Sequence, residues 1–447
     1  MSTLCCYFKS IELTNIKAFG EPAQLLEFTN AAGQLSQWNL LLGDNGVGKT
    51  TILQCLAEMS ADLTSPFAPP PSPESKGTKS HAPRVLRYLA KHTAALPAYG
   101  RVGSKNSQIR VSFCSGCDLG TIPTKKNSKK SGDTFLELHN GNFSSCQLIF
   151  DDYSSLQPCG YGAFRRFGTT KLGAELNPDS CATLFEDNEP LINVEEWLLR
   201  SDYAATKSKD SRAQQRLEHI RRLLTEFLPD VKSIRIKASG ADIPTPEANT
   251  QDGWVPVKSL STGYRATMAW VTDFAARMLD RYPNSENPFA EPAVVLVDQI
   301  DTHLHPKWQR QLIQDLSKAF PATQFIVTAH SPLMVLAMPD ANIVVLRRDN
   351  EGVKITRNAD DVRGWRLDQI IASGLFEEQP SRDSVSHDML EERRILLSKS
   401  TLSKEAKTRL NALNAWAATI PTADDPDDIR ALDIIRRAAE KIKIENK

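Results

Sequence analysis

A glycine-rich segment carries the most specific chemical signal in the 447-residue sequence. The segment from Gly43 to Thr50 reads GDNGVGKT and matches every fixed position of the phosphate-binding pattern G-x-x-x-x-G-K-[ST]. Small residues let backbone N–H groups turn toward phosphate oxygens, and the helix that follows adds the partial positive charge of its N-terminus. The segment therefore predicts a binding site for the phosphates of a nucleotide.

Each side chain of this segment has an expected role. Lys49 would reach the β- and γ-phosphates, and Thr50 would ligate Mg²⁺. We expect ATP and Mg²⁺ as cofactors, and the expected nucleotide-binding residues are Asn45, Gly46, Val47, Gly48, Lys49, Thr50 and Thr51.

A second chemical group follows the apolar run from Val294 to Val297. Asp298 ends this run, where a second ligand on the magnesium side belongs, reached directly or through water. The next residue is Gln299, at a place that normally holds a glutamate in ATPases of this architecture. A carboxamide can hold a water molecule but cannot accept its proton, so we expect binding to survive and hydrolysis to be slow or absent.

Histidines follow two of the apolar runs. His330 comes directly after the run Phe325–Val327, from where an imidazole can reach the γ-phosphate, so Asp298, Gln299 and His330 form the expected catalytic set. His303 and His305 lie with Asp301 on a short loop that shows no third metal ligand. We therefore expect that loop to serve contacts across a subunit boundary rather than a metal.

The helix start at Ser261, Thr262 and Gly263 is a second candidate anion site. A hydroxyl and backbone N–H groups at a helix N-terminus can bind an anion. Because the Lys49 loop already holds the phosphates of its own subunit, the expected occupant is the nucleotide of another copy. The alternative is an ordinary serine-capped helix start.

The surrounding elements predict an α/β fold. Uninterrupted apolar strands separated by helices are typical of a buried parallel sheet, and they are expected at Trp38–Leu42, Val294–Val297, Phe325–Val327 and Ile343–Leu346. Residues 1–175 and 231–365 would form two halves of one nucleotide-binding domain. Residues 176–230, with helical spacing at 194–203 and 214–228, would be a helical insertion, and residues 366–447 a helical extension that contacts a partner or another copy.

Composition narrows the class of protein. The length excludes one small domain, and a formal net charge of +0 argues against a wholly cationic nucleic-acid coat. No run approaches the 18 to 20 or so apolar residues that span a bilayer, and no signal-peptide layout is present, so we expect a cytoplasmic protein without a membrane partner.

Cys114 and Cys117 are expected to be reduced thiols rather than a zinc site. The proline-rich stretch 65–80 and the lysines of 125–130 are expected to be loops.

The motifs together resemble the nucleotide-binding domain of ABC-type ATPases, the class that includes the SMC-like, RecF and overcoming-lysogenization-defect families. Shorter segments are similar to ATPases of bacterial anti-phage operons, namely those of the Septu system and of retrons: Tyr161–Arg165, Leu184–Asp187, Glu195–Leu198 and Asp301–Gln309. The fold class that this implies is a P-loop ABC-type domain with a mixed sheet, a helical insertion and a helical C-terminal extension.

The resemblance implies a homo-oligomer in which two subunits sandwich two ATP molecules head to tail. Ser261 and Gly263 would then act on the nucleotide of the other subunit, Asp301 and His303 would lie at the seam, and His330 would sense the γ-phosphate. Lys17 and Phe19 lie on the early strand that often borders the base. Gln157 and Gln147 are both candidates for the glutamine loop.

The resemblance also implies regulation of a separate nuclease chain, of HNH or toprim type, in defence against phage. No fused toprim domain is expected, because the acidic residues near Asp424 lie in a helix-rich tail without strands. The alternative is a DNA-repair ATPase acting on DNA ends, so nucleic acid stays an open partner. Gln299 departs from the family's glutamate: either the natural protein turns over poorly, or the sequence carries a deliberate glutamate-to-glutamine change, which we favour.

Overall fold

The computed structural model describes most of the chain, in ranges separated by short gaps. These ranges are residues 6–30, 32–59, 100–102, 104, 106–115, 117–120, 134–139, 142–147, 156–166, 168, 179–207, 211–228, 230–238, 244–357, 362–376, 383–399 and 403–420. The chain divides into two compact units, one formed by residues 1–370 and 374–376 and the other by residues 371–373 and 377–447. The finer division into four regions stays a prediction.

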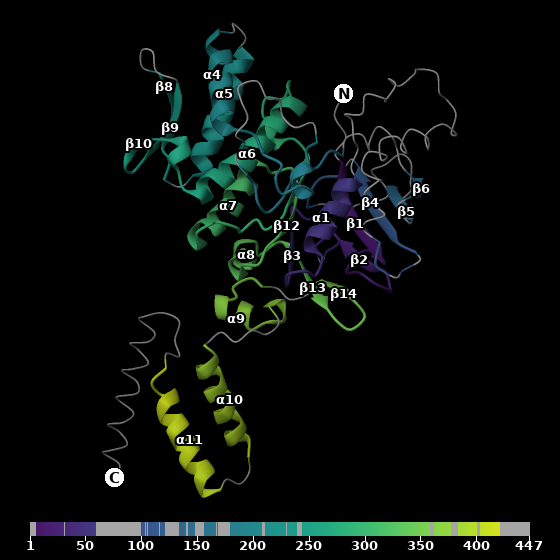
Figure 1. Cartoon of the computed structure of the whole chain (residues 1–447), viewed down its shortest axis with the longest axis vertical. Helices are drawn as coiled ribbons and strands as arrows, with labels where there is room; N and C mark the ends of the chain where they lie inside the picture. The colour runs from purple at the N-terminus through teal and green to yellow at the C-terminus, as the bar shows by residue number, and fades with distance from the viewer. Residues whose placement is uncertain are drawn as a thin grey trace. The chain divides into compact units, whose positions relative to one another are not determined.

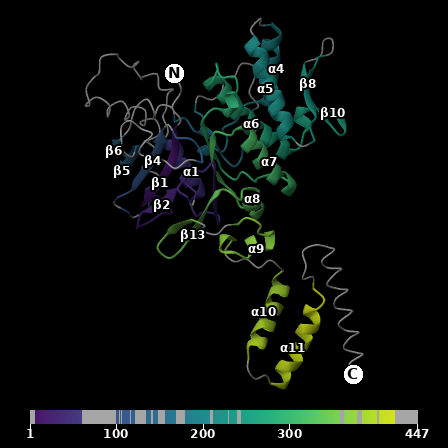
Figure 2. The same ribbon diagram turned by 180° about the vertical axis from the view of Figure 1, so that it is seen from behind.

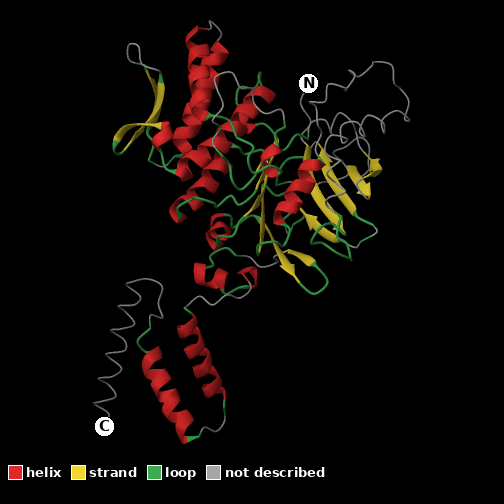
Figure 3. Cartoon of the chain, viewed as in Figure 1, coloured by secondary structure: helices red, strands yellow, loops and turns green. Residues whose placement is uncertain are grey.

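A six-stranded sheet forms the centre of the first unit (Figures 1 and 3). Its order is β14 (Val353–Arg357), β13 (Asn342–Arg348), β3 (Trp38–Gly43), β12 (Thr323–Thr328), β11 (Ala293–Val297) and β7 (Cys159–Tyr161). All neighbours pair in parallel except β13 and β14, which are antiparallel. The predicted buried parallel strands are confirmed, and their carboxyl ends meet at one edge, where ligands bind in such sheets.

The two faces of this sheet belong to two different hydrophobic clusters. Val295 and Val297 of β11 pack with the helices that follow the insertion, whereas Val294 and Leu296 pack on the opposite side. Successive side chains of a strand point to opposite faces, so a strand that is apolar throughout must be covered on both. Figures 1 and 2 show these two covers on opposite sides of the sheet.

One cover consists of α1 (Lys49–Glu58) and a five-stranded antiparallel sheet. That sheet has the order β2 (Gln24–Glu27), β1 (Cys6–Thr14), β4 (Gln108–Ser115), β5 (Thr134–His139) and β6 (Asn142–Gln147). The structure corrects the extent of the first strand, because β1 ends at Thr14 and a turn closed by Ile16 and Phe19 follows it.

The other cover is helical. It contains α4 (Val194–Lys207), α5 (Ser211–Phe227), α6 (Thr262–Arg281) and α7 (Pro306–Ala319), with the large side chains Trp270, Phe274 and Phe320 fully buried among them. A small antiparallel sheet lies between α5 and α6 in the chain and has the order β10 (Gly253–Pro256), β9 (Thr245–Thr250) and β8 (Ser233–Lys237). The helices expected at 194–203 and 214–228 are therefore confirmed, each with slightly different ends.

Four further α-helices lie in the described residues. They are α8 (Pro332–Ala337) and α9 (Leu367–Ile371), with α10 (Ser384–Ser398) and α11 (Lys404–Ala417) in the second unit. Ser403 caps α11 as predicted, because its hydroxyl accepts a hydrogen bond from the N–H of Ala406 at 3.2 Å. The predicted loops at 65–80 and 125–130 and the predicted helix at 429–442 lie outside the described residues.

Two findings bear on the compositional expectations. Cys114 and Cys117 form a disulfide, so the prediction of reduced thiols for this pair is wrong in the structure. In the part of the chain that the structure describes, no helix is both long and apolar enough to cross a bilayer.

Candidate functional site: the nucleotide cavity

The glycine-rich segment joins the central strand β3 to α1. Gly48 precedes the first helical residue and has the left-handed backbone φ of 95°, a region that favours glycine. A Cβ atom at this position would come within 2.9 Å of the Phe19 ring, so a larger residue would collide with the turn after β1. The segment is therefore held in a loop whose N–H groups precede a helix start, which is the arrangement that binds phosphates.

Lys49 is buried at the start of α1, with only 6% of its surface exposed. Its Nζ donates hydrogen bonds to the main-chain oxygens of Gly43 at 2.7 Å and Asp44 at 2.9 Å. Burial lowers the pKa of this amine, and the carboxylates of Asp298, Asp44 and Asp301 act in the opposite direction. A buried cation in such a place gains most from an anionic ligand, which restores the interactions that water would otherwise supply.

Asp298 lies at the carboxyl end of β11 and is also buried. Its Oδ2 accepts a hydrogen bond from the Thr50 hydroxyl at 2.8 Å, and its Oδ1 accepts one from the Thr328 hydroxyl at 2.6 Å. The Thr50 hydroxyl and the Asp298 carboxylate are oxygen donors of the kind that Mg²⁺ prefers. These two residues fit the magnesium role expected of them, and a bound Mg²⁺ would neutralise charge on the phosphates.

Gln299 follows Asp298 in a left-handed turn with φ of 49°. Its N–H donates to the Thr328 hydroxyl at 2.7 Å, and its side-chain Oε1 accepts a hydrogen bond from the Thr302 hydroxyl at 3.2 Å. The side chain is thus fixed by Thr302 where it lines the cavity. There a carboxamide can hold a water molecule but cannot accept its proton.

His330 follows β12, and the loop of Asp301 fixes its backbone. Asp301 Oδ2 accepts hydrogen bonds from the N–H of His330 at 3.1 Å and of Ser331 at 2.8 Å. Partial burial and the nearby Lys49 charge lower the pKa of the His330 imidazole from its ordinary 6.5. The ring is therefore neutral at neutral pH and can donate one hydrogen bond to a phosphate oxygen.

These groups surround one cavity of ≈ 560 Å³. It is lined by Lys17, Ala18, Asn45, Gly46, Gly48, Lys49, Thr50, Thr51, Asp298, Gln299, His330 and Arg348. The cavity unites the predicted catalytic set with most of the predicted nucleotide-binding set. Val47 is an exception, because its side chain is buried in the hydrophobic core instead.

Two lining residues were not predicted from the sequence. Ala18 belongs to the turn after β1, and Arg348 ends β13 and donates from its guanidinium to the main-chain oxygen of Gly46 at 2.8 Å. Neither carries a motif, so only the strand order could bring them to the site. Lys17 does line the cavity, whereas Phe19 is fully buried beneath Gly48, and both lie in the turn rather than on the predicted strand.

The predicted second anion site lies elsewhere on the same chain. Ser261 caps α6 by accepting a hydrogen bond from the N–H of Tyr264 at 3.4 Å. Ser261 and Thr262 are exposed, and Gly263 is buried so tightly that a Cβ atom would come within 2.4 Å of the His303 oxygen. None of the three lines the Lys49 cavity.

Neither candidate for the glutamine loop reaches the cavity. Gln147 ends β6 in the antiparallel sheet, and Gln157 precedes β7, at the opposite end from the site, where its main-chain oxygen accepts a hydrogen bond from Arg281 at 3.4 Å. The loop that does approach the site follows β7, and it brings Arg165 rather than a glutamine. The glutamine-loop residue, which the sequence left open between these two, stays a prediction.

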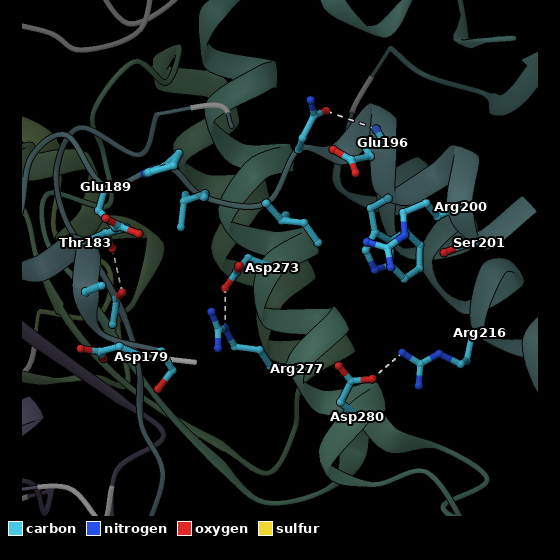
Figure 4. A pocket seen from close by; sticks show the side chains of 18 of the residues that line it. Asp179, Thr183, Glu189, Glu196, Arg200, Ser201, Arg216, Asp273, Arg277 and Asp280 are labelled. Carbon is cyan, nitrogen blue, oxygen red and sulfur yellow. Dashed lines mark hydrogen bonds and ion pairs between the residues drawn. The ribbon is translucent and has the colours of Figure 1, made fainter. Parts of the chain in front are cut away.

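A larger cavity of ≈ 800 Å³ lies between α4, α6 and the loop before α4 (Figure 4). Two of its arginines are already paired, Arg277 with Asp273 at 2.7 Å and Arg216 with Asp280 at 2.6 Å. The remaining charged groups of the wall are Asp179, Glu189, Glu196 and Arg200, so carboxylates outnumber cations. A triphosphate is better matched by the smaller cavity, which contains Lys49 and a helix N-terminus.

Family models match both halves of the nucleotide-binding unit. A model described as "AAA domain, putative AbiEii toxin, Type IV TA system" matches residues 175–336, and a second model described as "AAA domain" matches residues 10–150. Among solved structures, an SMC head bound to the C-terminal winged-helix domain of ScpA aligns at 15% identity with a TM-score of 0.43, covering 79% of this chain and 97% of that one. The SMC head of Thermotoga maritima aligns at 12% identity with a TM-score of 0.38, over 79% of this chain and 99% of that one.

Curated relatives point to two named groups. The Septu protein PtuA of Bacillus mycoides is 24% identical over 84% of this chain and 46% of its own length, and that of Bacillus thuringiensis is 22% identical over 74% and 77%. The retron Ec83 probable ATPase of Escherichia coli is 28% identical over 58% of this chain and 44% of its own length. The chain thus spans less than half the length of the first and third of these relatives. The chain is a homologue of Septu PtuA and of retron ATPases, and two of its segments are similar to AAA domains.

Proposed function

We propose that the chain binds Mg²⁺-ATP in the Lys49 cavity and acts as an ATPase of the SMC-like ABC class. The observation that carries this proposal is the convergence of a buried amine, a buried carboxylate and a helix N-terminus on one cavity. In it, Lys49 contacts the phosphates, Thr50 and Asp298 hold the metal, and His330 donates to the γ-phosphate.

The second part of the proposal is that two copies close around the nucleotide. The exposed hydroxyls of Ser261 and Thr262 stand at a helix start and are absent from their own chain's cavity. A phosphate held by Lys49 of one copy could accept hydrogen bonds from this helix start in the other copy. His303 lies beside this helix start, since its main chain packs against Gly263, and Asp301 is two residues before it in the same loop.

Hydrolysis is the part of the proposal that Gln299 limits. Glutamate has the same shape as glutamine and can accept the proton of the attacking water. We expect Gln299→Glu to raise the rate of phosphate release by on the order of 100-fold, a typical gain from general-base catalysis, while the affinity for ATP changes little. Gln314→Glu, an exposed change on α7, is the matched control. If phosphate release from Gln299→Glu stays at the rate of that control, position 299 does not hold the catalytic base.

We also propose that the ATP state controls a separate nuclease of HNH or toprim type in defence against phage. The similarity to Septu and retron proteins supports this role. The second unit offers a surface for a partner, because Val385, Ile395 and Leu397 of α10 are 65%, 46% and 53% exposed. The test is co-purification with the product of a neighbouring nuclease gene, with and without ATP. Association that survives deletion of residues 377–447 would exclude this surface.

The alternative of a DNA-repair ATPase gains no support from the described helices. Such proteins carry a long coiled coil between the phosphate loop and the signature helix. In the described parts of residues 51–259, the longest helix is α5, with 17 residues.

A further inference from the structure

The loop after β7 places Arg165 against the turn formed by Asp298 and Gln299, which is called the catalytic turn below. Arg165 is buried, with 5% of its surface exposed. Its Nη2 donates hydrogen bonds to the main-chain oxygens of Asp298, at 2.6 Å, and of Gln299. Its Nε donates to the main-chain oxygen of Gly162 at 3.1 Å, so the same guanidinium also ties the loop to itself.

The turn that Arg165 holds has an unfavourable backbone. Gln299 has φ of 49° and Arg165 itself has φ of 37°, both in the left-handed region that costs a residue with a side chain about 1 kcal/mol. Such conformations persist only where the surroundings hold them in place. Buried main-chain oxygens also need hydrogen-bond donors. Here one side chain, Arg165, donates to the carbonyl oxygens of two consecutive residues.

Two further contacts fix the same turn from neighbouring strands. The N–H of Asp298 donates to the Tyr161 oxygen of β7 at 2.8 Å, and the N–H of Gln299 donates to the Thr328 hydroxyl of β12 at 2.7 Å. Those contacts hold the N–H groups of Asp298 and Gln299, whereas Arg165 holds their carbonyl groups. The Gln299 oxygen also accepts a hydrogen bond from the N–H of Thr302 at 3.1 Å. Removal of the guanidinium would therefore take this donor from the Asp298 carbonyl and leave the Gln299 carbonyl with the Thr302 contact, while the N–H groups of Asp298 and Gln299 keep their partners.

The guanidinium keeps its charge in this buried position. Burial lowers its pKa to about 10, while Asp298 and Asp301 act to raise it, so the group is protonated at neutral pH. Arg165 does not line the nucleotide cavity. It therefore acts on the nucleotide indirectly, through the residues whose carbonyls it holds and through its charge near Asp298 and Asp301.

We propose that Arg165 is the positioning residue of the catalytic turn: by binding the carbonyls of Asp298 and Gln299 it sets the direction in which the side chain at position 299 enters the cavity. This inference rests on the proposed ATPase function and adds to it a residue that acts on turnover and not on nucleotide binding. The loop after β7 would thus take the place beside the catalytic strand where a glutamine loop was expected, with a contact to the main chain instead of the metal.

The test compares three substitutions in the Gln299→Glu protein. Arg165→Met keeps the aliphatic stem and removes every donor. Arg165→Lys keeps the charge and one donor nitrogen, but it lacks the second nitrogen that bonds the Gly162 oxygen. Arg166→Met is the matched control, because Arg166 is the exposed next residue. The measurements are kcat, the affinity for a nonhydrolysable ATP analogue, the melting temperature and amide hydrogen exchange in peptides that cover residues 298–302.

We expect Arg165→Met to lower kcat by on the order of 100-fold, the size of effect that follows a misplacement of about 1 Å. The affinity for the analogue should change by less than about threefold, because the phosphate contacts are intact, and Arg165→Lys should recover part of kcat. Exchange should accelerate in peptides that cover 298–302 and not elsewhere, because the N–H of Thr302 donates to the Gln299 oxygen that Arg165 holds. Should Arg165→Met fail to fold, Arg165→Lys alone must show the same separation of kcat from affinity.

Two results would overturn the inference. One is a kcat for the Arg165 variants equal to that of Arg166→Met. The other is a loss of affinity, melting temperature and kcat together with exchange that rises throughout the chain, which is the behaviour of a general structural residue. If Gln299→Glu itself does not hydrolyse ATP, the ATPase proposal fails at position 299. Hydrogen exchange then decides on Arg165, and unchanged exchange at 298–302 contradicts it.

Discussion

The two anion sites of this chain differ in how completely they are built. At the Lys49 cavity, the amine and the Asp298 carboxylate are buried and every contact of the turn is already in place. At the start of α6, Ser261 and Thr262 are exposed, and the Ser261 hydroxyl is engaged only by a long 3.4 Å hydrogen bond within its own helix among the contacts described.

This difference indicates where the free energy of assembly comes from. A site with buried, fixed charges can bind a nucleotide without a second protein, because little reorganisation is needed. An exposed helix start gains little from an anion in water and gains more when a partner excludes the water. We therefore expect nucleotide binding to be a property of one chain and the contact with α6 to appear only when two chains close.

The largest effect should come from removing the cation of the complete site. Lys49→Ala should weaken binding of a nonhydrolysable ATP analogue by on the order of 100-fold, about 2.7 kcal/mol, because a charge-assisted contact to phosphate is lost. Titration calorimetry measures this directly. Lys318→Ala removes an exposed lysine of α7 as the control. An affinity of Lys49→Ala equal to that control would place the nucleotide elsewhere.

A smaller and different effect is expected at the exposed site. Ser261→Arg should leave the nucleotide affinity of the single chain unchanged and weaken ATP-dependent dimerisation by about 10- to 100-fold, because a bulky side chain then stands where the partner's phosphate belongs. Sedimentation velocity with and without the analogue measures the change. Ser403→Arg is the control, since it removes a similar helix cap from α11. Equal dimerisation of the two variants would argue against a contact between subunits at Ser261.

The smallest effect is a pH dependence that sharpens the description of the complete site. The pKa of His330 lies below 6.5 in the free protein because burial and Lys49 disfavour the charged ring. A bound triphosphate should raise this pKa, so protons are taken up on binding and the affinity increases as the pH falls toward the free-state value. We expect a gain in affinity of about two- to fivefold between pH 7.5 and 6 as this pKa rises on binding. His330→Gln should lose that gain, and an identical pH profile in both proteins would remove His330 from the phosphate contact.

The sequence predicts those parts of the site in which the functional residues directly follow a recognisable apolar strand. Gly43–Thr50 and the pair Asp298 and Gln299 each stand beside a strand whose apolar residues are visible in the sequence, and the carboxyl ends of parallel strands meet at one edge. His330 follows from the same rule. Four of the six central strands and the helices of the insertion were therefore predictable to within a few residues at their ends, whereas β7 and β14 were not.

The remaining parts depend on strand order, which the sequence does not contain. Arg165 meets residues more than 130 positions away only because β7 lies next to β11. Arg348 reaches the phosphate loop because β13 lies next to β3. Gln157 precedes β7 and therefore lies at the end of that strand away from the cavity, and Gln147 ends β6 in the antiparallel sheet.

One measurement tests the central claim most directly: a structure of the chain with Mg²⁺ and a nonhydrolysable ATP analogue, determined by crystallography or electron microscopy. We predict two copies related by a two-fold axis, with the triphosphate in contact with Lys49 of one copy and within hydrogen-bond distance of the Ser261 hydroxyl of the other. Phosphates bound outside the Lys49 cavity, or an α6 start that faces solvent in every arrangement of copies, would contradict the account.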